Sequence, residues 1–472
     1  MMRRLPRLRI ALPCVVAALA AALPAVTPAQ PPAVLTAPAA VPDAPPAAPD
    51  APAAARTDEP QTINLSVVLR LAGLNNLDLA LVREAEHQAA AANDAATVGF
   101  FPWLSVGAAY AKHTGAAQDV SGNILDVDTQ LYQRSASLNA ELDLGDAIFQ
   151  KLAARQAQSA AGYNVEVQRN DTALAAASAY FDLVNAVAAE DIAREAVRIS
   201  QDYEQQLDRA FNIGLTNRSD VLRVSVQTQR EQVLVRQAQA QVRAAAAALA
   251  TELRLDASVA LEPAERIVAP PALVSLDTSV ADLVNNALSA RPELKGSAAS
   301  IAAAEQRQHA AKYGPLIPSL GARALEGQLR GGPNGYLSDY TTSHDYIVGL
   351  NWRLGPNGLF DFSRTEAADS QLRQQRLSDE KLRDTISQQV VDAFEAARAG
   401  LDEIGLSRRG LALAEQSLKL SEQRREFGVS AVLEVIQAQQ SLTQARTDYA
   451  EALTRYAKAQ YALAHATARI NQ

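Results

Sequence analysis

Four segments of the chain alternate apolar and polar residues with a period of two, the pattern of β-strands that have one apolar face. The alternation is clearest over 138–144 and 346–354, where the even positions are mostly apolar, and weaker over 104–110 and 320–324. We predict two strands of about 10 to 13 residues in each half of the chain, joined by polar loops at 114–131 and 330–343. Strands of this length can cross a membrane at a tilt, although a soluble, half-buried hairpin has the same pattern.

Each pair of strands is followed by two proline-free stretches of helical character. The first half contains 147–211 and 220–253, and the second half contains 359–427 and 432–470. An unbroken helix over the longest of these stretches would be on the order of 100 Å long. We predict two long helical hairpins, which bury their apolar stripes by coiled-coil packing because they are too long for a small globular core.

Three landmarks recur along the chain in the same order and at nearly constant separation. They are Pro102 and Pro318, 216 residues apart, Gly145 and Gly355, 210 apart, and Gly214 and Gly428, 214 apart. A repeat of this length indicates an internal tandem duplication. We predict one unit over 61–270 and a second over 271–472.

The residues before the first unit have a different character. Arginines precede an apolar run over 10–23 and small residues follow it, so 1–29 is predicted to be a secretory signal peptide cleaved after Ala29. Cys14 is alternatively a lipid acceptor, but the residues before it fit a lipobox poorly. Segment 30–60 is rich in Pro and Ala and is predicted to be disordered, because it has too little apolar area to fold.

Composition and charge exclude several classes of protein. Of the 472 residues 48% are apolar but only 5% aromatic, and Ala and Gln are abundant, which favours long helices. A net charge of -8 argues against nucleic acid as a partner, because phosphate binding needs a basic surface. A single cysteine excludes a disulfide framework, and five scattered histidines predict no metal site. We find no catalytic constellation and predict neither an enzyme nor a cofactor; the Gly-rich 331–335 is predicted to be a loop between strands.

Four strands cannot close a membrane barrel, since the smallest such barrels have eight strands and an open edge is not tolerated in lipid. The chain must therefore associate with copies of itself if its strands cross a membrane. Strands in a membrane joined to very long helices would form a conduit with a short barrel and a helical tube.

The residues around the two helix turns resemble those of the TolC-like outer-membrane efflux proteins, or outer membrane factors. The resemblance covers essentially 61–472 and is most specific at 211–222 and 427–439, with further support at 65–68 and 101–104. It implies a mainly α fold with membrane β-structure. In such a fold three protomers, each giving four strands, form a 12-stranded β-barrel, and their helical hairpins form a periplasmic α-barrel.

The resemblance also implies a function and partners. The protein would be the outer-membrane exit duct of a tripartite efflux or type I secretion system, in the cell outer membrane and extending into the periplasm. Its partners would be two further copies of itself, a periplasmic adaptor, an inner-membrane pump of RND, ABC or MFS type, and outer-membrane lipid. One alternative is a periplasmic adaptor of the same machinery, and another is a secreted hydrolase, which would need clustered catalytic residues.

The resemblance assigns a gate to the residues near the turns. Glu434 takes the place of an acidic residue that rings the constriction, and Gln437 takes the place where a second acid is often found. Asp220 and Ser219 begin a helix, where an acid and a hydroxyl can also serve only as caps. Arg425 stands where the family often has a tyrosine, and we predict an Arg425–Asp220 ion pair that holds the gate closed. For Glu434 an ordinary solvated position remains the alternative.

The turns themselves are predicted to dock an adaptor. Gly214 and Gly428 permit sharp turns with positive φ, and small neighbours keep the turns shallow. The predicted docking residues are Gly214, Leu215, Thr216, Gly428, Val429 and Ser430. A purely structural role of the glycines is the alternative.

Overall fold

The computed structural model describes residues 61–470 apart from 102, 270, 334–335, 357 and 427–431. All of them belong to one unit, Thr57–Gln472. The predicted signal peptide 1–29 and the segment 30–60 lie outside the described residues. So do three of the predicted docking residues, Gly428, Val429 and Ser430, and the side chain of Arg425.

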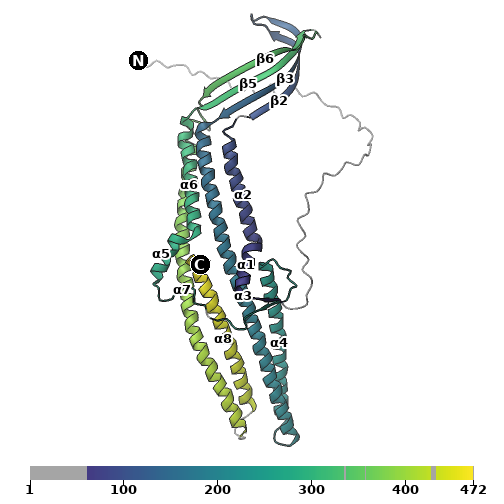
Figure 1. The fold of residues 1–472 in the computed structure, drawn as a ribbon, viewed down its shortest axis with the longest axis vertical. Coiled ribbons are helices and arrows are strands. Elements are labelled where there is room, and N and C mark those ends of the chain that lie inside the picture. Colours follow the sequence, from purple (N-terminus) through teal and green to yellow (C-terminus); the bar gives the residue numbers. More distant parts are fainter. Residues whose placement is uncertain are drawn as a thin grey trace, which may run out of the picture. The chain divides into compact units, whose positions relative to one another are not determined.

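The two halves of the described chain repeat one order of elements: two helices, two strands and two longer helices (Figure 1). In the first half these are α1 Leu65–Asn75, α2 Leu77–Val98, β2 Trp103–Gln118, β3 Ile124–Leu142, α3 Leu144–Asn212 and α4 Arg218–Glu252. In the second half they are α5 Val280–Ala290, α6 Pro292–Tyr313, β5 Ser319–Pro333, β6 Thr341–Asn351, α7 Phe362–Glu426 and α8 Val432–Ala466. Corresponding helices have 11, 22 and 35 residues in both halves, and the longest have 69 and 65. The origin of this repeat by duplication stays a prediction.

The predicted long helices are confirmed, and their bounds differ from the expected ones by a few residues. The predicted strands are also confirmed, but the predicted loops between them are too long. Ladder pairing of β2 with β3 continues from Tyr110↔Tyr132 to Gln118↔Ile124, so only a short turn remains where a long loop was expected. The polar residues there keep pairing because ladder hydrogen bonds come from the backbone and need no apolar side chains.

The strands form one antiparallel sheet in the order β2-β3-β5-β6. Its register aligns Leu104 with Leu138, Leu138 with Ala324, and Ala324 with Tyr346. One face is therefore apolar in its half near the helices, with Leu104, Val106, Leu138, Val348 and Leu350 all exposed. The other face is mostly small and polar, and the hydroxyls of Ser105 and Ser137 lie 2.6 Å apart on it. Within the chain β2 and β6 are the two edge strands.

The long helices also lie side by side in one layer, which has an outer helix on each of its two sides. Helix α3 packs against α4 and α8, and α8 packs against α7, which gives the order α4-α3-α8-α7 (Figure 1). Nearer the sheet the order is α2-α3-α6-α7. Each of the two longest helices would be on the order of 100 Å long at 1.5 Å per residue.

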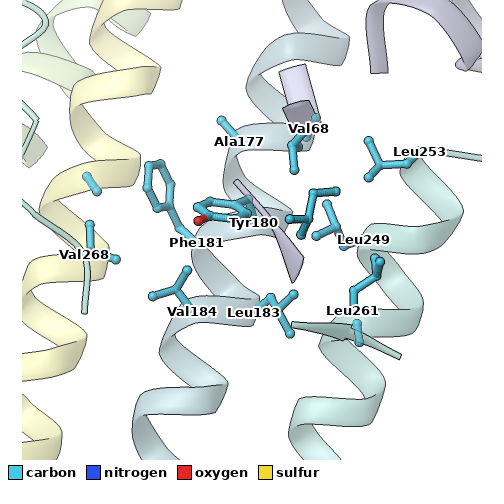
Figure 2. Packing of buried hydrophobic residues seen from close by; sticks show 14 of the residues in the cluster. Val68, Ala177, Tyr180, Phe181, Leu183, Val184, Leu249, Leu253, Leu261 and Val268 are labelled. Carbon is cyan, nitrogen blue, oxygen red and sulfur yellow. The ribbon is translucent and has the colours of Figure 1, made fainter. Parts of the chain in front are cut away.

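Three apolar clusters hold the helices together. In the first, Tyr180 and Leu183 of α3 meet Val68 of α1 and Leu249 of α4, and all four side chains are fully buried (Figure 2). Two short strands, β1 Gln61–Ile63 and β4 Leu261–Pro263, pair in parallel beside it. Burial, together with the charge of Glu265, raises the pKa of the Tyr180 hydroxyl to about 12, so it stays neutral. This cluster joins the first hairpin to β1 and α1 and, through Tyr461, to α8.

The start of α3 packs closely against two segments of the second half, the one between α6 and β5 and the start of α7. A Cβ on Gly145 would lie 2.2 Å from the carbonyl oxygen of Gly314, so only glycine fits this approach. Beside it, Nη2 of Arg364 on α7 lies 2.7 and 2.8 Å from the two carboxylate oxygens of Asp146 on α3. The pair is largely shielded from solvent and fixes the two longest helices at the base of the sheet.

Candidate functional site at the helix turns

The turn between α3 and α4 has the geometry of a Schellman motif. Helix α3 ends at Asn212, and Gly214 follows with φ of +79°. The N–H of Gly214 donates to the carbonyl of Phe211 and the N–H of Leu215 donates to that of Ala210, both at 2.9 Å. These two bonds satisfy carbonyls that the helix end leaves free, and glycine suits the left-handed conformation. The positive φ expected at Gly214 is found.

The same turn presents two aliphatic side chains to solvent. Ile213 is 72% exposed and Leu215 77% exposed, whereas Thr216 is half-buried. Both side chains lie beside the turn glycine, where they are available for contact with another molecule. Sequence reasoning selected Leu215 but missed Ile213, although an apolar residue directly before the turn glycine was a usable signal.

The start of α4 carries an ion pair within one helix. Arg218 is the first helical residue, Ser219 is exposed, and Asp220 lies in the first turn. The carboxylate of Asp220 pairs with Nη1 of Arg223 at 3.0 Å. The predicted Arg425–Asp220 pair stays a prediction, since the side chain of Arg425 lies outside the described residues.

The second hairpin is bridged close to its turn. Nη1 of Arg424, near the end of α7, lies 2.9 Å from Oε1 of Glu434 in the first turn of α8. Gln437 is exposed one turn further along the same face of α8. Arg424 partly neutralises Glu434 within its own chain, so the charge of a ring of Glu434 residues would depend on this arginine. The sequence did not single out Arg424, because a helical pattern alone does not tell which arginine reaches across the hairpin to Glu434.

Behind the turns the two hairpins share a cluster of buried residues. Leu207 and Val224 of the first hairpin pack with Val435 and Ile436 of the second. A chain of side-chain amides crosses the same seam: Gln440 of α8 donates to Gln227 of α4 at 2.9 Å, and Gln227 donates to Glu231 at 2.5 Å. Separating the hairpin tips would break these contacts. The site can therefore act as a mechanical closure; in the part of the chain that the structure describes, no group of three His, Cys, Asp or Glu could hold a metal.

The comparisons with known proteins agree with this architecture. Residues 283–469 match the family model "Outer membrane efflux protein". Outer membrane efflux protein BepC of Brucella suis biovar 1 (strain 1330) is 26% identical over 160 residues, 34% of this chain and 35% of that protein. The matched segment thus spans about a third of the length of that relative.

Solved structures of outer-membrane channels are similar over most of the chain. The outer-membrane channel OprN has a TM-score of 0.72 at 18% identity, over 85% of this chain and 89% of that one. The outer membrane protein VceC from Vibrio cholerae has 0.72 at 16% identity, over 85% and 95%. The CmeC outer membrane channel of Campylobacter jejuni has 0.72 at 17% identity, over 86% of both chains. At these identities the likeness concerns the fold.

Proposed function

We propose that the chain is the outer-membrane exit duct of a tripartite efflux or type I secretion system, because residues 283–469 match the outer membrane efflux protein family model. The resemblance seen in the sequence is thereby confirmed. A four-stranded sheet, apolar on one face, is joined to two very long helical hairpins, and the proposal rests on this observation. The sheet provides a membrane wall, and the hairpins provide a tube that reaches toward an inner-membrane partner.

The sheet is the element that we place in the outer membrane. Its apolar face would contact lipid and its polar face would line the lumen, which is the alternation of membrane barrels. Two helical stretches, Leu65–Val98 and Leu144–Asn212, are also long and apolar enough to cross a membrane by length and composition. The second of these buries Tyr180, Leu183 and Val184 against other helices, so it is already packed in the described fold.

Open edges support closure of the sheet by further copies of the chain. Strands β2 and β6 have no partner on their outer sides within the described chain, and exposed edges are not tolerated in lipid. We propose that β6 of one protomer pairs with β2 of the next. Three protomers then give a 12-stranded barrel, and all neighbours in it are antiparallel.

The two outer helices of the layer, α7 and α4, also expose apolar residues. Helix α7 exposes Leu406, Leu413 and Leu420, spaced by seven residues, and α4 exposes Val226 and Val233, also spaced by seven. A seven-residue apolar repeat is the seam of a coiled coil. We propose that α7 of one protomer packs against α4 of the next, so that the helices close into a periplasmic α-barrel.

We propose that the hairpin tips are both the gate and the docking surface. Glu434, Gln437, Asp220 and Ser219 would surround the constriction, and Arg425 would add its predicted pair with Asp220. The turn at Gly214–Thr216, with its equivalent at 428–430, would receive a periplasmic adaptor that is linked to an inner-membrane pump. The solvated aliphatic residues of the first turn support this assignment.

The alternative of a periplasmic adaptor is less well supported. It requires one helical hairpin flanked by β-rich segments, whereas this chain has two hairpins and a strand pair before each. The matched family and the similar structures are channels rather than enzymes, which leaves a secreted hydrolase without support.

Deletion of the gene and complementation with the full chain test the proposed function. We expect the deletion strain to become sensitive to drugs or metals, or to lose a secreted protein, and the chain to be found in outer-membrane fractions as an oligomer that dissociates on heating. A chain found in the inner membrane or free in the periplasm would contradict the proposal.

A further inference from the structure

Two arginines share one aromatic ring on the apolar face of the sheet, in the half far from the helices. The guanidinium carbons of Arg134 on β3 and Arg330 on β5 lie 4.3 and 5.6 Å from the ring centroid of Tyr340. The register places both on the face that carries Leu138, because Arg134 pairs with Gln328 and Arg330 with Tyr132. Nε of Arg134 donates to Oε1 of Gln328 at 2.9 Å, which holds the guanidinium in place.

The positive charge of this pair is not balanced by the described residues. Neither arginine has a carboxylate within salt-bridge distance in that part of the chain, and the buried Nε of Arg330 has no hydrogen-bond partner there. The nearest acid along β5, Glu326, is engaged by His344 at 3.4 Å and by the hydroxyl of Tyr346 at 3.2 Å. Two adjacent guanidinium groups beside apolar surface are stabilised when an anion joins them, and their planar N–H forks match phosphate oxygens.

The height of the pair on the strands fits a membrane interface. Tyr340 lies directly before β6 and ten residues before Leu350. If the chain is extended over this distance, the two are about 34 Å apart along the strand at 3.4 Å per residue and about 26 Å apart in height at a tilt near 40°. A membrane barrel has an apolar band about 25 Å tall with aromatic girdles at both interfaces. Trp352 lies just beyond one end of this span, and Tyr340 lies at the other.

Two further tyrosines lie at the level of Tyr340 and support a membrane interface there. The rings of Tyr110 and Tyr132, in the row of Arg330, lie 4.7 Å apart. Tyrosine and arginine together are typical of the level where acyl chains give way to headgroups.

We propose that Arg134 and Arg330, held by Tyr340, bind a phosphate of a phosphorylated lipid of the outer leaflet. The inference rests on the proposed function, because it requires the sheet to span the outer membrane with its apolar face in lipid. A lipid is the occupant rather than free phosphate because exposed apolar side chains on the same face, Val106, Leu104 and Leu138, lie between the arginines and the helices and can receive its acyl chains. Glu326 and His344 pair with each other in the row of Val106.

Reconstitution of the purified full-length chain tests the proposal. The oligomer is placed in phosphatidylcholine vesicles with increasing amounts of lipid A, and its dissociation temperature is measured on unheated and heated gels. The variant Arg134→Gln/Arg330→Gln is compared with wild type and with Arg323→Gln. Arg323 is the matched control, because it lies on β5 but on the opposite face of the sheet.

We expect lipid A to raise the dissociation temperature of wild type and of the control at the same concentrations. The double variant should need at least about tenfold more lipid A, because two charge-assisted contacts are lost. Dephosphorylated lipid A and inorganic phosphate should have no such effect. Equal lipid dependence of wild type and double variant would overturn the proposal, as would an equal response to inorganic phosphate. Failure of all three proteins to insert would contradict the proposed function itself, and this inference with it.

Discussion

The exposed leucine stripe of α7 allows a quantitative test of how the protomers associate. Leu413 is 66% exposed in the single chain and lies at the centre of the stripe, between Leu406 and Leu420. If α7 packs against α4 of the next protomer, this side chain becomes buried on assembly. The substitution Leu413→Ser removes that gain and should weaken the oligomer without disturbing the fold of the single chain.

The size of the effect follows from the area still available for burial. Full burial of a leucine side chain contributes about 1.5–3 kcal/mol, so the remaining two thirds are worth about 1–2 kcal/mol per interface. A closed ring of three protomers has three such interfaces, which gives about 3–6 kcal/mol per trimer. This corresponds to a dissociation constant about 10²- to 10⁴-fold larger.

The assay is the temperature at which the detergent-extracted oligomer separates into single chains on a gel. Leu401→Ser is the control, because Leu401 lies on the same helix with 48% exposure but about 120° around the helix axis from Leu413 at 3.6 residues per turn. We expect the oligomer with Leu413→Ser to dissociate at a clearly lower temperature than wild type, and the control to remain close to wild type. A wild-type dissociation temperature for Leu413→Ser would refute the assignment of this stripe to the interface between protomers.

Three further predictions concern the gate and the junctions. Arg424→Ala removes a partner that bridges to Glu434 across the second hairpin, so open events in planar bilayers should become more frequent. Arg223→Ala breaks a pair within one helix and should change the frequency of open events less. Equal gating in wild type and both variants would contradict the role of Arg424. Asp146→Asn weakens the largely shielded pair in which Nη2 of Arg364 contacts both carboxylate oxygens, and thermal unfolding should show a loss of about 1–3 kcal/mol. No change would mean that the pair does not stabilise the junction. Hydrogen bonding to Lys312 and Gln308 lowers the pKa of Asp369 from 3.8, so its contribution to stability is present above that pH and lost as the pH falls through the lowered pKa. Asp369→Asn should therefore destabilise the protein at pH 7 and have a progressively smaller effect as the pH falls below 3.8; an effect that does not change with pH would contradict this.

The long helices could be predicted from the sequence because their signal is local. A stretch without proline, rich in Ala and Gln, can form only a few structures, and a glycine followed by a polar turn marks its end. The start of α8 was therefore predicted at the residue where it begins, Val432. The helices α5 and α6 were missed, because Arg291 and Pro292 between them resemble a linker. In the fold Pro292 occupies the first helical position, where its missing N–H costs nothing.

The strand ends and the contacts at the turns could not be predicted in the same way. The extension of β2 and β3 beyond Tyr110 and Tyr132 depends on backbone pairing between the two segments. Hydrophobic periodicity describes side chains only and does not predict this pairing. The bridge from Arg424 to Glu434 depends on the relative rotation of two helices, which is set by packing of the whole hairpin. The sequence indicated that charged residues gather at the turns, but their pairing required the three-dimensional arrangement.

We propose that copies of this chain form a duct through the outer membrane that is closed by the hairpin tips. Single-channel recording of the purified full-length protein in planar bilayers tests it most directly. We expect discrete conductance steps that are rare in wild type and more frequent in Arg424→Ala, with a preference for cations. Protein that inserts as an oligomer but never conducts, in either form, would contradict it.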